Sequence, residues 1–234
     1  MEKNELFRQA LSQEIFSSYN EEDLFSIGVA IGNNPVVFKE LYQAYLKNGA
    51  RYENKPMLGA KIEVDFMRET DEIMIKRVET TFKLNSETFL SYLNMLNICF
   101  GEVYPMGSVV ELDGETLTES YAKAMRIKPS EKPLMATITG RFIPIGESEN
   151  HFTEYMASLW PYGASDELAP LFISKMMIKR VIHQGMIDEV EAEYVKKLRE
   201  RLIAEDQRSM AFLTDKAVDV LLGVAFEDET ESGE

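Results

Sequence analysis

The sequence predicts an α+β fold: a small antiparallel sheet or partly open barrel, with helices towards the N- and C-terminal ends. Three observations support this prediction. Apolar residues alternate with polar ones between residues 61 and 84, which is the period of a half-buried strand. Two more strand-like runs, at 105–112 and 133–142, contain or end at a glycine. Before residue 50 and after residue 188, apolar residues instead recur at helical spacing.

The chain is long enough for one large domain or two small ones. It has 234 residues, of which 45% are hydrophobic, so it can bury a core without covalent staples. A single cysteine excludes an intramolecular disulfide framework. The N-terminus carries no apolar run that would act as a signal peptide, and no stretch approaches the length of a membrane span. We therefore expect a cytoplasmic protein without membrane insertion.

The charge is strongly acidic, with a formal net value of -15 and a pI near 4.7. This balance argues against nucleic acid as a partner, because a phosphate backbone is held by clustered lysine and arginine. Two interpretations of the acidity remain open. It keeps the chain soluble, or it steers the protein towards a basic partner such as a nuclease toxin.

Residues 1–100 are expected to form an N-terminal helical region with a β-hairpin. Asn20 and Asn34 precede apolar helical patterns and are suitable caps, and Ser86 is the expected cap of a later apolar helix. The hairpin has its turn near residue 70 and a single second strand over residues 73–84.

Two features within these N-terminal helices have structural explanations. Gly28 and Gly32 fall on one face of the second helix, which favours close backbone packing there. Cys99 ends the apolar helix that follows the hairpin, and we expect it to be a buried small hydrophobe rather than a nucleophile, since no basic neighbour activates it.

Residues 104–205 are expected to form a central α+β domain, after a boundary at residues 100–105. The segment 117–127 is either a short helix or an excursion over the sheet edge. The run from residue 152 to residue 160 is either a strand or a short helix. Two short strands flank a turn at residues 174–177, and Asp188 caps a helix with an acidic first turn.

Residues 206–226 are expected to form a C-terminal helix, followed by a disordered acidic tail over residues 227–234. The apolar stripe of this helix either docks on the body of the protein or faces a partner helix. Its members are Phe212, Leu213, Leu221 and Leu222.

No catalytic or metal-binding motif is evident. The two histidines, His151 and His183, lie in different segments without further ligands at metal-binding spacing. A phosphate-binding glycine loop and a nucleophile elbow are also missing. The acidic residues that follow Asp188 fit a solvated first helical turn better than an acid/base pair. The sequence therefore predicts a protein that is not an enzyme and needs no cofactor.

The segment Trp160-Pro161-Tyr162-Gly163 has two interpretations. Two aromatic residues and a proline in a loop form a rigid apolar surface of the kind found at binding hot spots. Alternatively, Trp160 closes the core of a small barrel.

Four motifs follow one another in the central region. They are a Pro-x-Gly-Ser-Val-Val opening at residues 105–110, a strand from Pro133 to Arg141, the Pro-Tyr-Gly loop at 161–163, and the run from Val181 to Glu189 that leads into a helix. In this order they resemble a domain-of-unknown-function family found in Gram-positive bacteria, beside genes for LXG-type toxins of the type VII (ESX/Ess) secretion system. The resemblance does not cover residues 1–100.

The resemblance implies an accessory protein that acts as a chaperone or targeting adaptor for an LXG toxin or its small helical partner proteins. Such a protein needs an exposed apolar surface or strand edge to engage the toxin's helical export domain. The residues expected to contact the partner are Trp160, Tyr162, Phe212, Leu213, Leu221 and Leu222. The alternative is an acidic immunity protein that neutralises the toxin's catalytic domain, which the charge of -15 favours.

Overall fold

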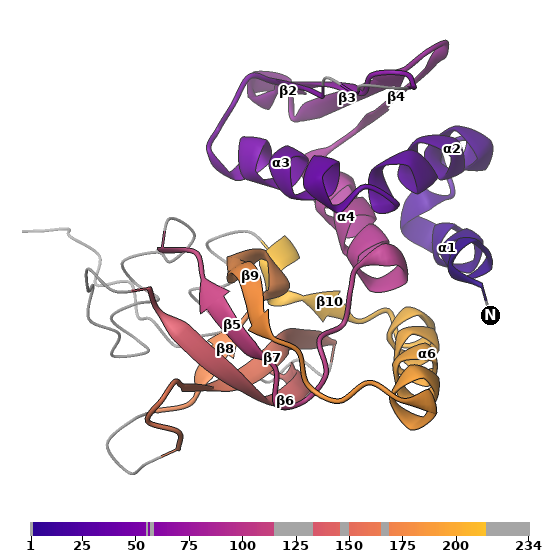
Figure 1. The fold of residues 1–234 in the computed structure, drawn as a ribbon. Helices are drawn as coiled ribbons and strands as arrows, with labels where there is room; N and C mark the ends of the chain where they lie inside the picture. The colour runs from indigo at the N-terminus through magenta and orange to yellow at the C-terminus, as the bar shows by residue number, and fades with distance from the viewer. Residues whose placement is uncertain are drawn as a thin grey trace, which may run out of the picture.

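The chain folds into helices and two sheets. The computed structural model describes residues 2–54, 56, 59–114, 133–145, 150–164 and 169–213. Within these ranges there are five α-helices, one sheet of four strands and one of six (Figure 1). Neither sheet closes on itself in the described residues. The α+β prediction is therefore confirmed, with open, largely antiparallel sheets rather than a partly open barrel.

The N-terminal part contains three helices and a four-stranded meander. The helices are α1 (Lys3–Leu11), α2 (Glu21–Gly32) and α3 (Pro35–Leu46), with a 3₁₀ turn, η1 (Glu14–Phe16), after α1. The strands are β1 (Arg51–Glu53), β2 (Glu63–Met67), β3 (Glu72–Arg77) and β4 (Thr80–Leu84), with η2 (Arg68–Thr70) between β2 and β3. Each strand pairs antiparallel with the next one in the chain.

The prediction of a single strand for the second half of the hairpin is wrong. Instead of one strand over residues 73–84, β3 and β4 pair with each other around a two-residue turn at Val78 and Glu79. Ile75 faces Phe82 across this turn. Tight turns of this kind favour asparagine or glycine, and this one has neither, with Val78 at a φ of 55°. The turn therefore left no signal in the sequence.

Helix α4 (Ser86–Phe100) lies between the N-terminal elements and the second sheet (Figure 1). Every residue from Thr88 to Phe100 is buried, so the helix is surrounded by the rest of the protein. Gly28 and Gly32 let neighbouring side chains pack closely against the backbone of α2, in line with the close packing predicted there. A Cβ added at Gly28 would lie 2.5 Å from the Phe7 ring, and one at Gly32 would lie 2.4 Å from the Phe100 ring.

The predicted helix caps are confirmed at α2, α3 and α6. The side chains of Asn20, Asn34 and Asp188 each accept a hydrogen bond from the third backbone N–H of their helix. At α4 the prediction of Ser86 is wrong. The cap is Asn85, which has an extended backbone and accepts a 2.8 Å hydrogen bond from the Thr88 N–H, while Ser86 is already helical.

The second sheet has the order β10-β7-β6-β5-β9, and β8 also pairs with β7. Its strands are β5 (Val109–Leu112), β6 (Met135–Pro144), β7 (His151–Leu159), β8 (Leu171–Ile173), β9 (Ile178–His183) and β10 (Arg208–Ser209). A 3₁₀ turn, η4 (Lys175–Met177), joins β8 to β9, as predicted. The open assignment of residues 152–160 is settled as a strand. The segment 117–127, predicted as a short helix or an excursion over the sheet edge, lies outside the described residues.

The predicted C-terminal helix is wrong over its first residues. Helix α6 spans Glu189–Ala204, and just beyond its end Asp206 adopts a left-handed φ of 49°. The chain then becomes extended as β10, which pairs parallel with β7, and continues as η5 (Met210–Phe212). The Ser209 N–H and hydroxyl donate hydrogen bonds to the side chains of Asn94 and Glu154, which fix this path of the chain. Residues 214–226 and the acidic tail at 227–234 lie outside the described residues.

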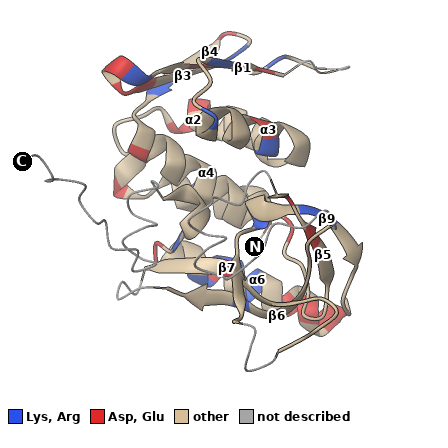
Figure 2. Cartoon of the chain, turned by 90° about the vertical axis from the view of Figure 1, so that its left-hand side faces the viewer, with Lys and Arg blue, Asp and Glu red and all other residues tan. Residues whose placement is uncertain are grey.

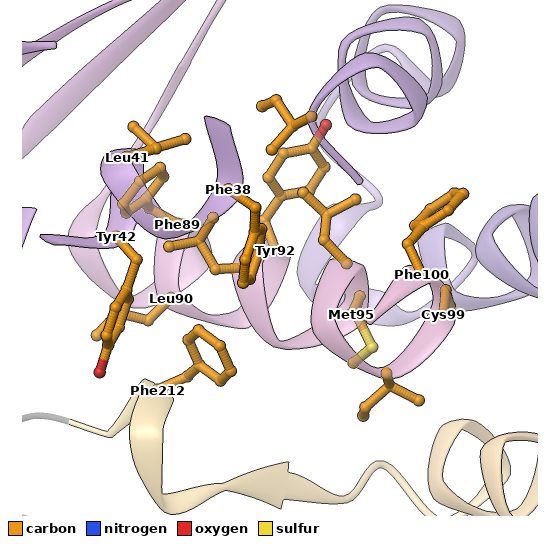
Figure 3. Packing of buried hydrophobic residues seen from close by; sticks show 14 of the residues in the cluster. Phe38, Leu41, Tyr42, Phe89, Leu90, Tyr92, Met95, Cys99, Phe100 and Phe212 are labelled. Atoms are coloured by element: carbon orange, nitrogen blue, oxygen red, sulfur yellow. The ribbon is translucent and has the colours of Figure 1, made fainter. Parts of the chain in front are cut away.

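The larger hydrophobic core runs across the predicted boundary at residues 100–105. It joins residues of α1 to α4 and of the first sheet with Phe152, Leu198, Leu202 and Phe212 from the later part of the chain. Figure 3 shows Phe212 beside Tyr42 and beneath α4. A smaller core lies within the second sheet around Val110, Ile138 and Ile173.

Candidate partner-binding surface

The structure separates the residues that the sequence grouped as partner contacts. Trp160 is 45% exposed and Tyr162 71% exposed in the loop after β7, so neither closes a core. Phe212 is fully buried, and its assignment as a contact residue is wrong. Leu213 is partly buried, and Leu221 and Leu222 lie outside the described residues.

Trp160 and Phe212 also lie at opposite ends of β7. Ser209, just before η5, pairs with Phe152 at the start of this strand. Trp160 follows the far end of the strand, roughly 26 Å away along it. A single contact patch that includes both the aromatic loop and the Phe212 segment is therefore absent from the described residues.

A different set of apolar side chains is exposed where β9 leads into α6. We call it the β9–α6 strip; its members are Met106, Ile182, Met186, Ile187, Val190 and Tyr194. Val190 is the most exposed of them, at 77%. Val190 and Tyr194 are four residues apart on α6, so they point from the same face of the helix. A sequence signal was available for Val190 alone, because this apolar residue interrupts an otherwise acidic first turn.

An open groove of about 640 Å³ adjoins the strip between α6, the end of α4 and the start of α1. Leu6, Phe100, Val103 and Val195 contribute apolar side chains to it, and Ile187 belongs to both the groove and the strip. Grooves with apolar walls and a polar rim are typical of sites that receive the side chains of a helix. The groove extends the apolar surface from the strip towards the N-terminal helices.

Buried contacts hold the strip in place. Arg141 of β6 forms a two-pronged ion pair with Glu191 of α6, and its guanidinium lies 4.7 Å from the centre of the Tyr194 ring. The N–H of Gly185 donates a 3.0 Å hydrogen bond to the Ser108 hydroxyl. A Cβ at Gly185 would lie 2.1 Å from the Met106 carbonyl oxygen, so only glycine fits there. These contacts therefore hold the strip in one conformation before a partner binds.

Charged side chains on the free edge strand β9 are already paired. Lys179 and Arg180 donate hydrogen bonds of 2.9 and 2.7 Å to the Glu111 carboxylate of β5. Figure 2 shows the basic part of β9 beside the acidic part of β5. These bonds, that from Lys179 first, lower the pKa of Glu111 below its ordinary value. Lysine and arginine on an edge strand also discourage pairing with another strand. Strand addition at β9 is therefore disfavoured relative to contact with the strip.

The cysteine does not form a reactive site. Cys99 is buried in the larger core, and burial raises the pKa of its thiol to about 12. It is therefore a protonated apolar side chain at neutral pH, in line with the role predicted for it. In the part of the chain that the structure describes, no three histidine, cysteine or acidic side chains are grouped to hold a metal ion.

Comparisons with known proteins give no relative. No family model matches the chain, and neither a curated protein nor a solved structure matches it. Among the described residues, no helix has both the length and the apolar character that crossing a membrane requires.

Proposed function

We propose that this chain is a non-enzymatic accessory protein, a chaperone or targeting adaptor, that binds an LXG-type toxin in the cytoplasm for type VII secretion. One observation supports the proposal above the others. The β9–α6 strip overlaps the run from Val181 to Glu189, which is among the motifs that carry the resemblance to the toxin-associated family. The exposed apolar surface and the family-like motif are thus the same part of the molecule.

An amphipathic helix of the export domain is the partner that fits this surface. Val190 and Tyr194 present apolar groups one helical turn apart, which matches the spacing of side chains on a partner helix. The adjoining groove offers space for the larger of those side chains. Asp188 and Glu189 are exposed beside Val190, so the partner helix is expected to carry lysine or arginine next to its apolar stripe.

The net charge of -15 favours a second candidate, an immunity protein that neutralises the toxin's catalytic domain. An acidic protein is attracted to the basic substrate-binding surface of a nuclease, and this attraction raises the association rate. The two candidates differ in which half of the toxin they bind.

Co-purification with the separated halves of an LXG toxin tests both candidates. We expect the full chain to elute with the N-terminal export half in size-exclusion chromatography and to leave the C-terminal half free. The same experiment at 0.5 M salt checks that apolar contact rather than charge dominates, because exposed charge pairs are screened at about this ionic strength. Elution with the C-terminal half alone would replace the adaptor with the immunity protein, and elution with neither half would contradict both.

A further inference from the structure

A second, smaller cavity lies beside the groove, with which it shares Pro35, Phe100 and Glu102, and its volume suits a small ring. It measures about 180 Å³ and lies between the end of α4, the junction of α2 and α3, and η4. Its apolar walls are formed by Phe38, Leu96, Phe100 and Met176. An engineered apolar cavity of about 150 Å³ in another protein binds benzene, so a six-membered ring fits into this volume.

The cavity is lined by three lysines, of which Lys175 differs from the other two. Lys39 donates a 3.0 Å hydrogen bond to the Ile178 carbonyl, and Lys179 is paired with Glu111. Lys175 is partly buried in the wall, and its amine has neither a hydrogen bond nor an ion pair within the described residues. A partly buried cation without a partner is unfavourable, and an anion in the cavity would relieve this cost.

Two neighbouring carboxyl groups, those of Glu154 and Glu102, act on the Lys175 charge from a distance and raise its pKa, but within the described residues neither forms a hydrogen bond or an ion pair with it. Glu154 lies behind Lys175 on β7, but its carboxyl accepts hydrogen bonds from Asn97 and Ser209 and, within the described residues, forms no ion pair with Lys175. Burial raises the pKa of Glu154 above its ordinary value, which favours the neutral form. Glu102, the acidic residue lining the cavity, is exposed to solvent.

The carbonyl end of α4 also faces this region and would repel an anion if it were uncovered. Arg199 covers it, donating hydrogen bonds to the carbonyl oxygens of Ile98, Cys99 and Gly101. The Lys3 amine covers the Phe100 carbonyl oxygen at 3.3 Å. The negative end of the helix is therefore compensated, and the positive charge of Lys175 remains available to a ligand.

We propose that this cavity binds a small organic carboxylate, with its apolar body against Phe38, Leu96 and Phe100 and its carboxylate paired with the Lys175 ammonium. Two observations join here: an apolar space of ring size, and a lysine in its wall that forms no hydrogen bond or ion pair within the described residues. Burial lowers the pKa of Lys175 to about 8, so the amine is still mostly protonated at pH 7 and able to pair with a carboxylate.

Three probes of the same shape and different charge test this proposal on the full chain by isothermal titration calorimetry at pH 7. They are benzoate, benzamide and benzylamine. We expect benzoate to bind at least about tenfold more tightly than benzamide, because a charge-assisted hydrogen bond is roughly twice as strong as a neutral one. Benzylamine should not bind, because its cation would face Lys175. Equal binding of all three, or no binding of benzoate, would overturn the proposal.

Substitution of the lysine supplies an independent readout. Lys175→Met removes the charge but keeps an unbranched apolar side chain, and we expect it to weaken benzoate binding at least about tenfold. Lys197→Met, on the exposed face of α6, is the matched control and should leave binding unchanged. Unchanged benzoate affinity in a folded Lys175→Met variant would contradict the assigned role. If that variant fails to fold, the three probes on the native chain still decide the question.

Discussion

Phe212→Ala is expected to lower the free energy of unfolding by about 3–5 kcal/mol, as large-to-small substitutions of buried aromatics do. The Phe212 ring is fully buried and packs edge-on against Tyr42 at 5.3 Å and Phe38 at 6.2 Å between ring centres. Alanine would leave a cavity between α3 and η5. It would also loosen the segment in which the Tyr42 hydroxyl donates to the Ala211 carbonyl.

Urea unfolding followed by circular dichroism measures this effect, with Tyr162→Ala as the matched control. Both aromatic residues were predicted from the sequence to contact a partner, but Tyr162 is 71% exposed. Its truncation should change the free energy of unfolding by no more than about 0.5 kcal/mol. Equal stability of the two variants would show that Phe212 is not part of the core.

Arg199→Met is expected to cost about 2–4 kcal/mol of stability, because hydrogen bonds to charged groups contribute roughly 1.5–3 kcal/mol each and are not additive. One guanidinium donates to three carbonyl oxygens, those of Ile98, Cys99 and Gly101, at 2.5 to 2.7 Å. These hydrogen bonds connect α6 to the end of α4, across the boundary predicted from the sequence. Methionine can fill part of the space but leaves these acceptors without their donor.

Arg201→Met is the matched control for Arg199→Met. It lies two residues further along α6, is mostly exposed, and forms a 3.9 Å pair with Glu205. Surface pairs contribute between about 0 and 1 kcal/mol, so this variant should unfold close to the native chain. Thermal melts of the two variants at equal protein concentration make the comparison. If Arg199→Met and the control melted at the same temperature, the hydrogen bonds of Arg199 would not stabilise the contact between α6 and α4.

Local signals in the sequence were sufficient for much of the fold. Side-chain caps act within three residues, so Asn20, Asn34 and Asp188 identified the starts of their helices. The turn at Val78 and Glu79 was missed because it uses no residue that favours a left-handed conformation.

The burial of Phe212 depends on tertiary contacts, which the spacing of apolar residues in the sequence does not reveal. An apolar residue at helical spacing fits equally well a stripe facing a partner and a segment docked into the core. Here the left-handed Asp206 and the pairing of Ser209 with Phe152 turn the chain inwards, and Phe212 meets α3. The exposed strip was missed for a related reason: its members come from three segments, around Met106, β9 and α6, that only the fold brings together.

Two valines provide the most direct test of the proposal that the β9–α6 strip binds the toxin's export domain. Val190 and Val36 each occupy the second position of a helix, α6 and α3, and are 77% and 64% exposed. Glutamate is favourable near a helix N-terminus, so neither substitution should harm folding.

The measurement is the affinity of Val190→Glu and Val36→Glu for the N-terminal export half of the LXG toxin, by titration calorimetry. We predict that Val190→Glu weakens binding at least about tenfold, or 1.4 kcal/mol, because a carboxylate would be buried against an apolar partner. Val36→Glu should bind as the native chain does. Native affinity in Val190→Glu, or an equal loss in both variants, would contradict the assignment of the strip as the binding surface.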